Sequence, residues 1–315
     1  MEIILVFPGQ GSQKPGMARD LVEAFPSAHM ALADADEVTP HGSASLASLM
    51  FDGPADELTL THNAQPALLA HGAALWSVLR DAVAPHVRAA AGHSLGEFTA
   101  YHAAGALRLR DALTLVRRRG ELMYRTGTER PGTMAAVLGT LTRSVDDICR
   151  EASAAGIVVP ANYNTDEQVV ISGEIAAVER AMEIAKTSGA KRAMRLQVSG
   201  AFHSPLMQPA AEGLGAALAA ARWREPAFPV YSNVDAVPNS SGASATDLLV
   251  RQLTSPVRWV ESVRRMAADL PGALFVELGP GNVLAGLIKR IVPNAETFAC
   301  GTAADVRTLL SRLSA

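Results

Sequence analysis

A serine flanked by glycines is the feature of this sequence with the clearest chemical potential. Residues 92–97 read Gly-His-Ser-Leu-Gly-Glu, between a short apolar segment at 87–91 and an alanine-rich segment at 95–106. A Gly-x-Ser-x-Gly pattern between a strand and a helix is typical of a nucleophile elbow, where a tight turn exposes the serine hydroxyl, here that of Ser94. The glycines avoid Cβ clashes in such a turn, and the amide of Leu95 at the helix N-terminus is placed to bind a developing oxyanion. Taken alone, the pentapeptide also fits a helix-capping serine.

A serine nucleophile needs a general base, and two of the eight histidines stand out. His93 adjoins Ser94, but neighbours at the end of a strand point in different directions, which favours a structural, hydrogen-bonded role. His203 follows the last strand expected in a small inserted domain, where the chain re-enters the larger one. A cleft between domains is where a catalytic base is expected, so His203 is the predicted base.

Six short motifs occur in the order and spacing of one protein family. They are Gly9–Gln13, Gly92–Glu97, Arg119-Gly120, Ala201–His203, Gln252 and Glu277–Gly281. On these motifs the chain resembles the malonyl-CoA:acyl carrier protein transacylases, from Phe7 to about residue 291. The same architecture is that of the acyltransferase domains of fatty acid and polyketide synthases.

The resemblance implies a role for each matching residue. Ser94 would attack the thioester of malonyl-CoA, and His203 would take up its proton. The amides of Gln10 and Leu95 would form the oxyanion hole. A backbone carbonyl next to Gln252 would orient the base in place of an acid, and Gln252 is also expected among the substrate-binding residues.

Two further residues bear on substrate choice. Arg119 would bind the free carboxylate of the malonyl group, because a guanidinium pairs with a carboxylate at two points. Its neighbours Arg117 and Arg118 are expected on a solvated helix face. Phe202, directly before the base, favours malonyl over methylmalonyl, although a methyl group is worth only about 1–3 kcal/mol in a pocket. Tyr124 stands where the family usually has glutamine, which leaves the shape of that end of the pocket open.

Four other segments match family positions near the expected cleft. Glu97, Asn162 and Asn164 are expected to be structural, since asparagine near a turn usually bonds its own backbone. The glycine-rich segment 277–281 opens a helix and could bind phosphate there. A turn that braces the elbow is the favoured interpretation of that segment.

The elements that must position these residues follow from the hydrophobic pattern. Residues 1–130 alternate short apolar strands with amphipathic helices, and this pattern resumes over 199–315, with a turn-rich surface loop expected at 238–242. Residues 131–198 follow the order β-α-β-β-α-β, which is typical of a ferredoxin-like unit. The predicted fold is a large α/β-hydrolase-like domain with a parallel sheet and a nucleophile elbow, into which a small ferredoxin-like domain is inserted.

Composition narrows the class of protein. The chain has 315 residues, 49% of them hydrophobic, and a net charge of −3 without a long basic run, which argues against nucleic acid or an anionic membrane as main partner. Cys149 and Cys300 are far apart in sequence, so we expect buried, reduced thiols and no metal site. No signal peptide or transmembrane segment is apparent. We expect a cytoplasmic monomer with no bound cofactor.

The sequence therefore predicts an enzyme that moves malonyl from malonyl-CoA to the phosphopantetheine thiol of an acyl carrier protein. The reaction would proceed in ping-pong order through a malonyl-serine intermediate. It would supply extender units for fatty acid synthesis. A trans-acting acyltransferase of a polyketide synthase would use the same catalytic residues. An acyl-thioester hydrolase is disfavoured by Arg119. An inactive scaffold that docks carrier proteins is disfavoured because Ser94, His203, Gln10 and Arg119 occur together.

Overall fold

Two β-sheets organise the chain, of which the computed structural model describes residues 1–39 and 45–314. The larger sheet has the order β10-β9-β1-β2-β7-β8, and its pairs are parallel except for the antiparallel β7–β8 pair. Its strands are β1 (Ile3–Phe7), β2 (Val87–Gly92), β7 (Val230–Tyr231), β8 (Pro238–Asn239), β9 (Leu274–Leu278) and β10 (Thr297–Cys300). The predicted α/β class with a parallel sheet is confirmed at this level.

Helices cover both faces of the large sheet. They are α1 (Arg19–Ala24), α2 (Pro26–Val38), α3 (Leu46–Asp52), α4 (Ala55–Thr59), α5 (Thr61–Val83), α6 (Gly96–Ala103), α7 (Leu109–Glu129), α10 (Gln208–Ala220), α11 (Gly242–Gln252), α12 (Trp259–Asp269), α13 (Val283–Ile291) and α14 (Ala303–Ser314). Side chains alternate across β1, so Leu5 packs against one group of helices, while Val6 faces α12 and α13. Burial on both faces explains why β1 is apolar throughout.

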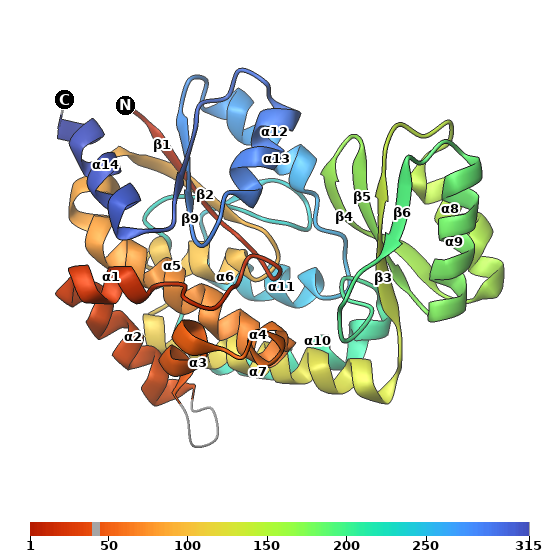
Figure 1. The fold of residues 1–315 in the computed structure, drawn as a ribbon, viewed down its shortest axis with the longest axis horizontal. Helices are drawn as coiled ribbons and strands as arrows, with labels where there is room; N and C mark the ends of the chain where they lie inside the picture. The colour runs from red at the N-terminus through yellow and green to blue at the C-terminus, as the bar shows by residue number, and fades with distance from the viewer. Residues whose placement is uncertain (40–44, 315) are drawn as a thin grey trace.

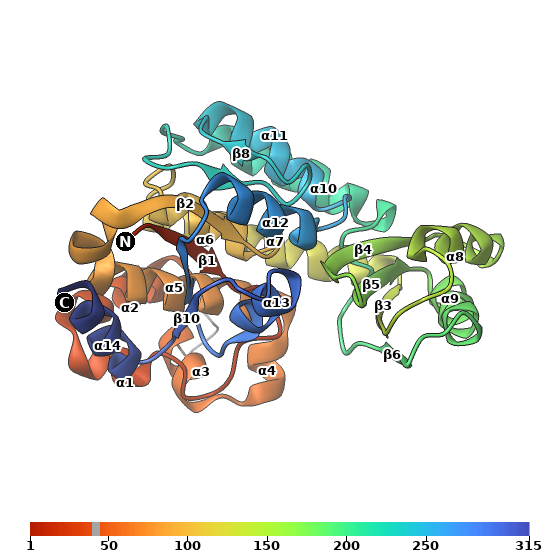
Figure 2. The same ribbon diagram turned by 90° about the horizontal axis from the view of Figure 1, so that it is seen from above.

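The smaller sheet forms a separate lobe at one end of the molecule (Figure 1), and a second view shows the same separation (Figure 2). Its strands, in the order β4-β5-β3-β6 and antiparallel throughout, are β3 (Thr133–Leu138), β4 (Val158–Thr165), β5 (Gln168–Gly173) and β6 (Arg192–Arg195). Helices α8 (Val145–Ala152) and α9 (Ile175–Thr187) pack on it around a core of their own.

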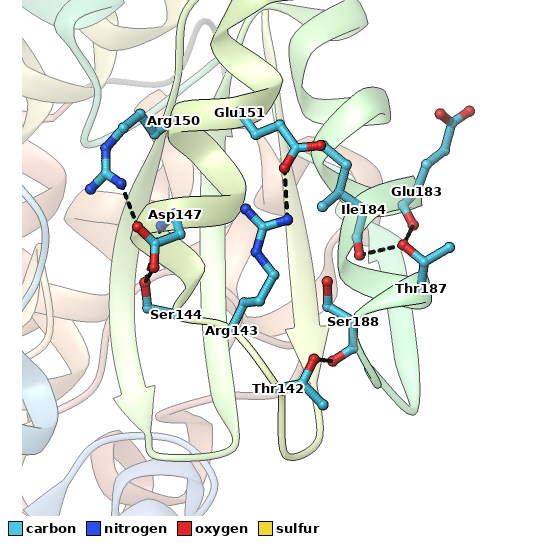
Figure 3. Close-up of polar contacts among 10 residues, drawn as sticks. All are labelled: Thr142, Arg143, Ser144, Asp147, Arg150, Glu151, Glu183, Ile184, Thr187 and Ser188. Carbon is cyan, nitrogen blue, oxygen red and sulfur yellow. Dashed lines mark hydrogen bonds and ion pairs between the residues drawn. The ribbon is translucent and has the colours of Figure 1, made fainter.

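Polar contacts hold the ends of α8 and α9 at the surface of this lobe (Figure 3). The Ser144 hydroxyl caps α8 by accepting a hydrogen bond from the amide of Asp147. The same hydroxyl donates to the Asp147 carboxylate, and Thr142 donates to the carbonyl of Ser188 at the end of α9. Arg143, just before α8, forms an ion pair with Glu151 in the last turn of that helix. Exposed pairs of this kind contribute at most about 1 kcal/mol each, so the apolar core dominates the stability of the lobe.

A backbone connection joins the two lobes. Val257 donates its amide to the carbonyl of Ala161 at 2.8 Å, and its own carbonyl accepts from the amide of Tyr163 at 2.9 Å. The segment after α11 thereby extends the edge of β4 and connects the small lobe to the large one.

Several local predictions need correction. The expected surface loop at 238–242 contains β8, and the buried Asn239 side chain donates to the hydroxyl of Tyr101 at 3.0 Å, because the turn formers here end an edge strand and cap α11. The last strand of the unit expected over 131–198 ends at Arg195, so residues 196–198 lie outside the small sheet.

Two other features of the described chain bear on its class. Cys149 and Cys300 are buried free thiols. Over residues 1–39 and 45–314, no helix is both long and apolar enough to cross a membrane.

Candidate active site

Ser94 lies at a strained turn between β2 and α6. Its φ of 51° falls in the left-handed region, which non-glycine residues adopt at a cost and which clusters at functional sites. A Cβ on Gly92 would lie 1.8 Å from the carbonyl carbon of Gly96, and a Cβ on Gly96 would lie 2.0 Å from the carbonyl oxygen of Phe7. Both glycines are therefore required sterically by the turn that presents the serine.

Asn233, in the loop after β7, fastens this turn from the neighbouring strand. Its side-chain oxygen accepts from the amide of Ser94 at 2.7 Å, and its side-chain nitrogen donates to the carbonyl of Gly92 at 2.7 Å. Asn233 was not predicted from the sequence. Its position directly after the short apolar segment 228–232 was the available signal, because the carboxyl ends of parallel strands share one edge of a sheet.

His203 lies against the serine, although 109 positions separate them in sequence. Its Nε2 is 2.8 Å from the Ser94 hydroxyl, and its Nδ1 donates to the backbone carbonyl of Gln252 at 2.8 Å. The carbonyl of Gln252 itself therefore accepts this hydrogen bond, where a carbonyl next to it was expected. Because Nδ1 carries the proton, Nε2 is free to accept the proton of the serine.

Burial keeps the imidazole neutral. Loss of solvent, and next the positive charge of Arg119, lower the pKa of His203 to about 3. The imidazole is therefore in its basic form throughout the neutral range. The φ of His203, 57°, is also left-handed, so both halves of the pair are held in unusual backbone conformations.

Arg119 extends from α7 to the serine with its guanidinium fully enclosed. Its Nη2 donates to the Ser94 hydroxyl at 3.0 Å and to the side-chain oxygen of Gln252 at 2.9 Å, and its Nη1 donates to Gln65 at 2.8 Å. Its Nε has no partner, and no carboxylate within residues 1–39 and 45–314 forms an ion pair with it. Burial lowers the pKa of Arg119 to about 10, which still leaves it charged at neutral pH. The result is a buried cation held by neutral amides.

Gln65, which holds this guanidinium from α5, was not predicted from the sequence. Its signal was weak, since a glutamine before a proline at the start of a helix has many ordinary roles. Of the neighbouring arginines, Arg118 is exposed as expected. Arg117 is half-buried and donates to the carbonyl of His62 and the side chain of Asn63, because α7 packs closely against α5.

Ser94 and Arg119 open into a cavity of about 350 Å³ between the two lobes. The large lobe contributes Gln10, Leu95, Phe202 and His203, and the small lobe contributes others: Met134, Asn162, Leu196, Gln197 and Val198. Phe202 is 5% exposed and reaches the cavity wall. Tyr124 does not line the cavity and instead stacks edge-on against His62, so the departure from the family glutamine does not alter this wall.

The predicted oxyanion donors lie at the same end of the cavity. Leu95 precedes α6, and Gln10 follows the close approach of Gly9 to the elbow, where a Cβ on Gly9 would lie 2.5 Å from the carbonyl oxygen of His93. Neither the amide of Gln10 nor that of Leu95 has a hydrogen-bond acceptor among the described residues. Both amides are thus available to a ligand.

The remaining motif residues have structural contacts. His93 donates to the side-chain oxygen of Asn164 at 2.8 Å, so Asn164 bonds across the lobes and not to its own backbone as expected. The carboxylate of Glu277 accepts from the amides of Leu284 and Ala285 at the start of α13. Those amides are therefore occupied, which supports the bracing interpretation over phosphate binding. In the described part of the chain, no three His, Cys, Asp or Glu side chains gather as metal ligands would.

Comparisons with known proteins agree with this geometry. The family model described as acyl transferase domain matches residues 4–306. The malonyl CoA-acyl carrier protein transacylase of Bacillus subtilis is 43% identical over 300 residues, which cover 95% of this chain and 93% of that protein. The acyl-carrier-protein-S-malonyltransferase of Bartonella henselae, a solved structure, has a TM-score of 0.94 at 40% identity, with complete coverage of both chains. A malonyl-transacylase solved in complex with a type II PKS acyl-carrier protein has a TM-score of 0.94 at 41% identity, covering 99% of this chain and 100% of that one.

Proposed function

The chain belongs to the acyl transferase domain family, and on that premise we propose that it transfers a malonyl group from malonyl-CoA to the thiol of an acyl carrier protein. One observation carries the choice of acyl group. A buried guanidinium, which has no carboxylate partner among the described residues, lies 3.0 Å from the serine hydroxyl, where an acyl group with a free carboxylate would complete the pair.

The first half-reaction forms a malonyl-serine ester. The Ser94 oxygen attacks the thioester carbonyl while its proton passes to Nε2 of His203, 2.8 Å away. The carbon–sulfur bond then breaks, and the imidazolium returns the proton to the leaving CoA thiolate. The carbonyl of Gln252 holds the ring in the tautomer that can accept the proton.

The second half-reaction runs the same steps with another thiol. The phosphopantetheine thiol of the carrier protein gives its proton to His203 and attacks the ester, and the proton then returns to Ser94 as the carbon–oxygen bond breaks. In both half-reactions the amides of Gln10 and Leu95 stabilise the oxyanion. Each amide lowers the activation barrier by about 3 kcal/mol. Phe202 narrows the cavity wall and so favours malonyl over a branched acyl group.

The finer description of the fold is part of this proposal. We assign residues 1–130 and 199–315 to an α/β-hydrolase-like domain and residues 131–198 to a ferredoxin-like insert. The order β3-α8-β4-β5-α9-β6 and a core separate from that of the large lobe support the insert. The strained serine between a parallel strand and a helix supports the hydrolase-like description. The monomeric state, the absence of a cofactor and the cytoplasmic location stay predictions.

A polyketide pathway is the second candidate for the reaction's use. The similarity to a malonyl-transacylase solved with a type II PKS acyl-carrier protein favours it, whereas malonyl transfer to a carrier protein, the activity for which the relatives are named, does not depend on the pathway. Both pathways require the same chemistry at Ser94, and the partner carrier protein distinguishes them.

Intact-mass analysis tests the proposed function. The protein incubated with malonyl-CoA should gain one malonyl group, and Ser94→Ala should gain none. Addition of a phosphopantetheinylated carrier protein should remove the adduct and malonylate the carrier. Parallel incubations with methylmalonyl-CoA and acetyl-CoA should give less adduct. An adduct that persists in Ser94→Ala would contradict the assignment of the nucleophile.

A further inference from the structure

A second buried charge lies beside the nucleophile. Glu97, in the first turn of α6, is fully buried, and its Oε2 accepts from the side-chain nitrogen of Gln252 at 2.6 Å and from the amide of Asn233 at 3.2 Å. Its other oxygen, Oε1, is buried without a hydrogen-bond partner among the described residues. A carboxyl group with one free oxygen can carry a proton there without breaking an existing contact.

One amide group connects this carboxyl to the guanidinium. Gln252 donates its nitrogen to Glu97 and accepts with its oxygen from Nη2 of Arg119, at 2.6 Å and 2.9 Å. The two ionisable groups are thus neighbours through a single side chain without touching each other. When Glu97 is ionised, its negative charge balances the buried positive charge of Arg119.

We propose that Glu97 takes up a proton when the substrate carboxylate binds Arg119, so that the closed site keeps the same net charge. This inference rests on the proposed function, because it requires a malonyl carboxylate at Arg119. The substrate brings a second anion to one buried cation. Two carboxylates that share one site in a low dielectric cannot both stay ionised cheaply, and the one that can accept a proton does so.

The electrostatics of the site allow Glu97 to bind this proton near neutral pH. Burial raises the pKa of Glu97 to about 7, against the lowering effects of the hydrogen bonds from Gln252 and Asn233 and of the charge of Arg119. Pairing of Arg119 with the substrate weakens the last of these effects, so the pKa of Glu97 rises further on binding. Asp235 acts in the same direction, and Tyr101, whose pKa is itself raised by burial, is neutral.

Glu97 is therefore a positioning residue that also sets how acyl preference depends on pH. The free energy needed to protonate Glu97 lowers the kcat/KM for malonyl-CoA. It does not affect the kcat/KM for acetyl-CoA, which brings no carboxylate to Arg119. Titration of His203, and of the CoA phosphates common to both substrates, cancels in the ratio of the two constants. The ratio of malonyl to acetyl kcat/KM should accordingly fall as the pH rises above neutrality.

The test is this ratio measured from pH 6 to 8, well below the pKa of about 10 of Arg119, in the wild type, in Glu97→Gln and in Glu277→Gln. The glutamine at position 97 retains an oxygen that accepts from Gln252 and Asn233 but cannot titrate. Glu277 is an equally buried glutamate that caps α13 away from the cavity, which makes it a matched control. We expect the ratio to fall about tenfold or more in the wild type and in Glu277→Gln, since one unit of pKa rise corresponds to a factor of ten. The ratio should be flat in Glu97→Gln.

A flat ratio in the wild type, or a wild-type slope in Glu97→Gln, would overturn the inference. If Glu97→Gln does not fold, a pH indicator in weakly buffered wild-type protein decides the matter. Transfer from CoA to serine consumes no proton overall, so malonyl-CoA near pH 8 should cause uptake of a large fraction of one proton per site and acetyl-CoA none. Equal readings for the two substrates would refute the role of Glu97. Failure of the wild type to form any malonyl adduct would refute the proposed function instead.

Discussion

Replacement of Arg119 by alanine is the most direct test of charge recognition. The guanidinium is fully buried, and its contacts are with Gln65, Gln252 and the hydroxyl of Ser94. Alanine removes the cation and leaves a polar cavity wall. A malonyl carboxylate would then be buried without a partner, whereas an acetyl group has no such charge.

The expected magnitude follows from these contacts. Removal of one partner of a buried ion pair costs about 3–5 kcal/mol, which is roughly a 100-fold to 1,000-fold loss or more. The lost hydrogen bond to Ser94 affects both substrates and cancels in their ratio. The ratio of malonyl to acetyl kcat/KM should therefore fall by about 100-fold or more in Arg119→Ala. Arg119→Lys should recover only part of this loss, because an ammonium cannot form the two-point contact of a guanidinium.

The assay is acyl transfer to a carrier protein, measured with both CoA thioesters for the wild type and each variant. Arg118→Ala is the matched control, since it removes an exposed arginine one position away on the same helix. An unchanged ratio in Arg119→Ala would refute carboxylate recognition by this residue. Dicarboxylic acyl preference would then have no basis in the cavity.

Three further predictions concern the base, the elbow and acid stability. His203→Ala should slow both acylation by malonyl-CoA and transfer to the carrier, measured separately in single-turnover experiments, and near-normal acylation would show that another group is the base. Gly96→Ala places a Cβ 2.0 Å from the carbonyl oxygen of Phe7 and should cost about 3 kcal/mol or more in urea unfolding, whereas Gly286→Ala, in an open helical position, should cost nothing. The pKa values of His203 and His71 are lowered to about 3 and about 4 by burial, so the unfolded chain binds more protons below pH 6.5. Each histidine should therefore lower the free energy of unfolding by about 1.4 kcal/mol per pH unit as the pH falls from 6.5 toward its folded pKa, and His71→Gln should reduce the slope.

The sequence determined the features that depend on neighbours along the chain. Gly92 and Gly96 are required because a Cβ at either position would clash with the backbone around Ser94. The Gly-x-Ser-x-Gly pattern therefore predicted the tight turn. The unbroken apolar run of β1 likewise predicted a strand that is buried on both faces, as the structure shows. The family resemblance, which the comparisons confirm, rests on short motifs of this kind in a fixed order.

Only the tertiary structure decided which groups meet at the site. Asn233 and Gln65 gave little local signal, and each acquires its role from a partner distant in sequence. Likewise, Pro238 and Asn239, expected in a surface loop, form the edge strand β8. The Asn239 side chain can be buried there because the hydroxyl of Tyr101 accepts its hydrogen bond.

The charge state of the site belongs to the same level of structure. His203 is neutral and Glu97 can be protonated near neutral pH because packing removes both from water, which no spacing along the chain specifies. Residue types and motif order thus indicated which chemistry the chain could perform. Desolvation and the choice of hydrogen-bond partners, which exist only in the folded chain, set the protonation states with which it would perform that chemistry.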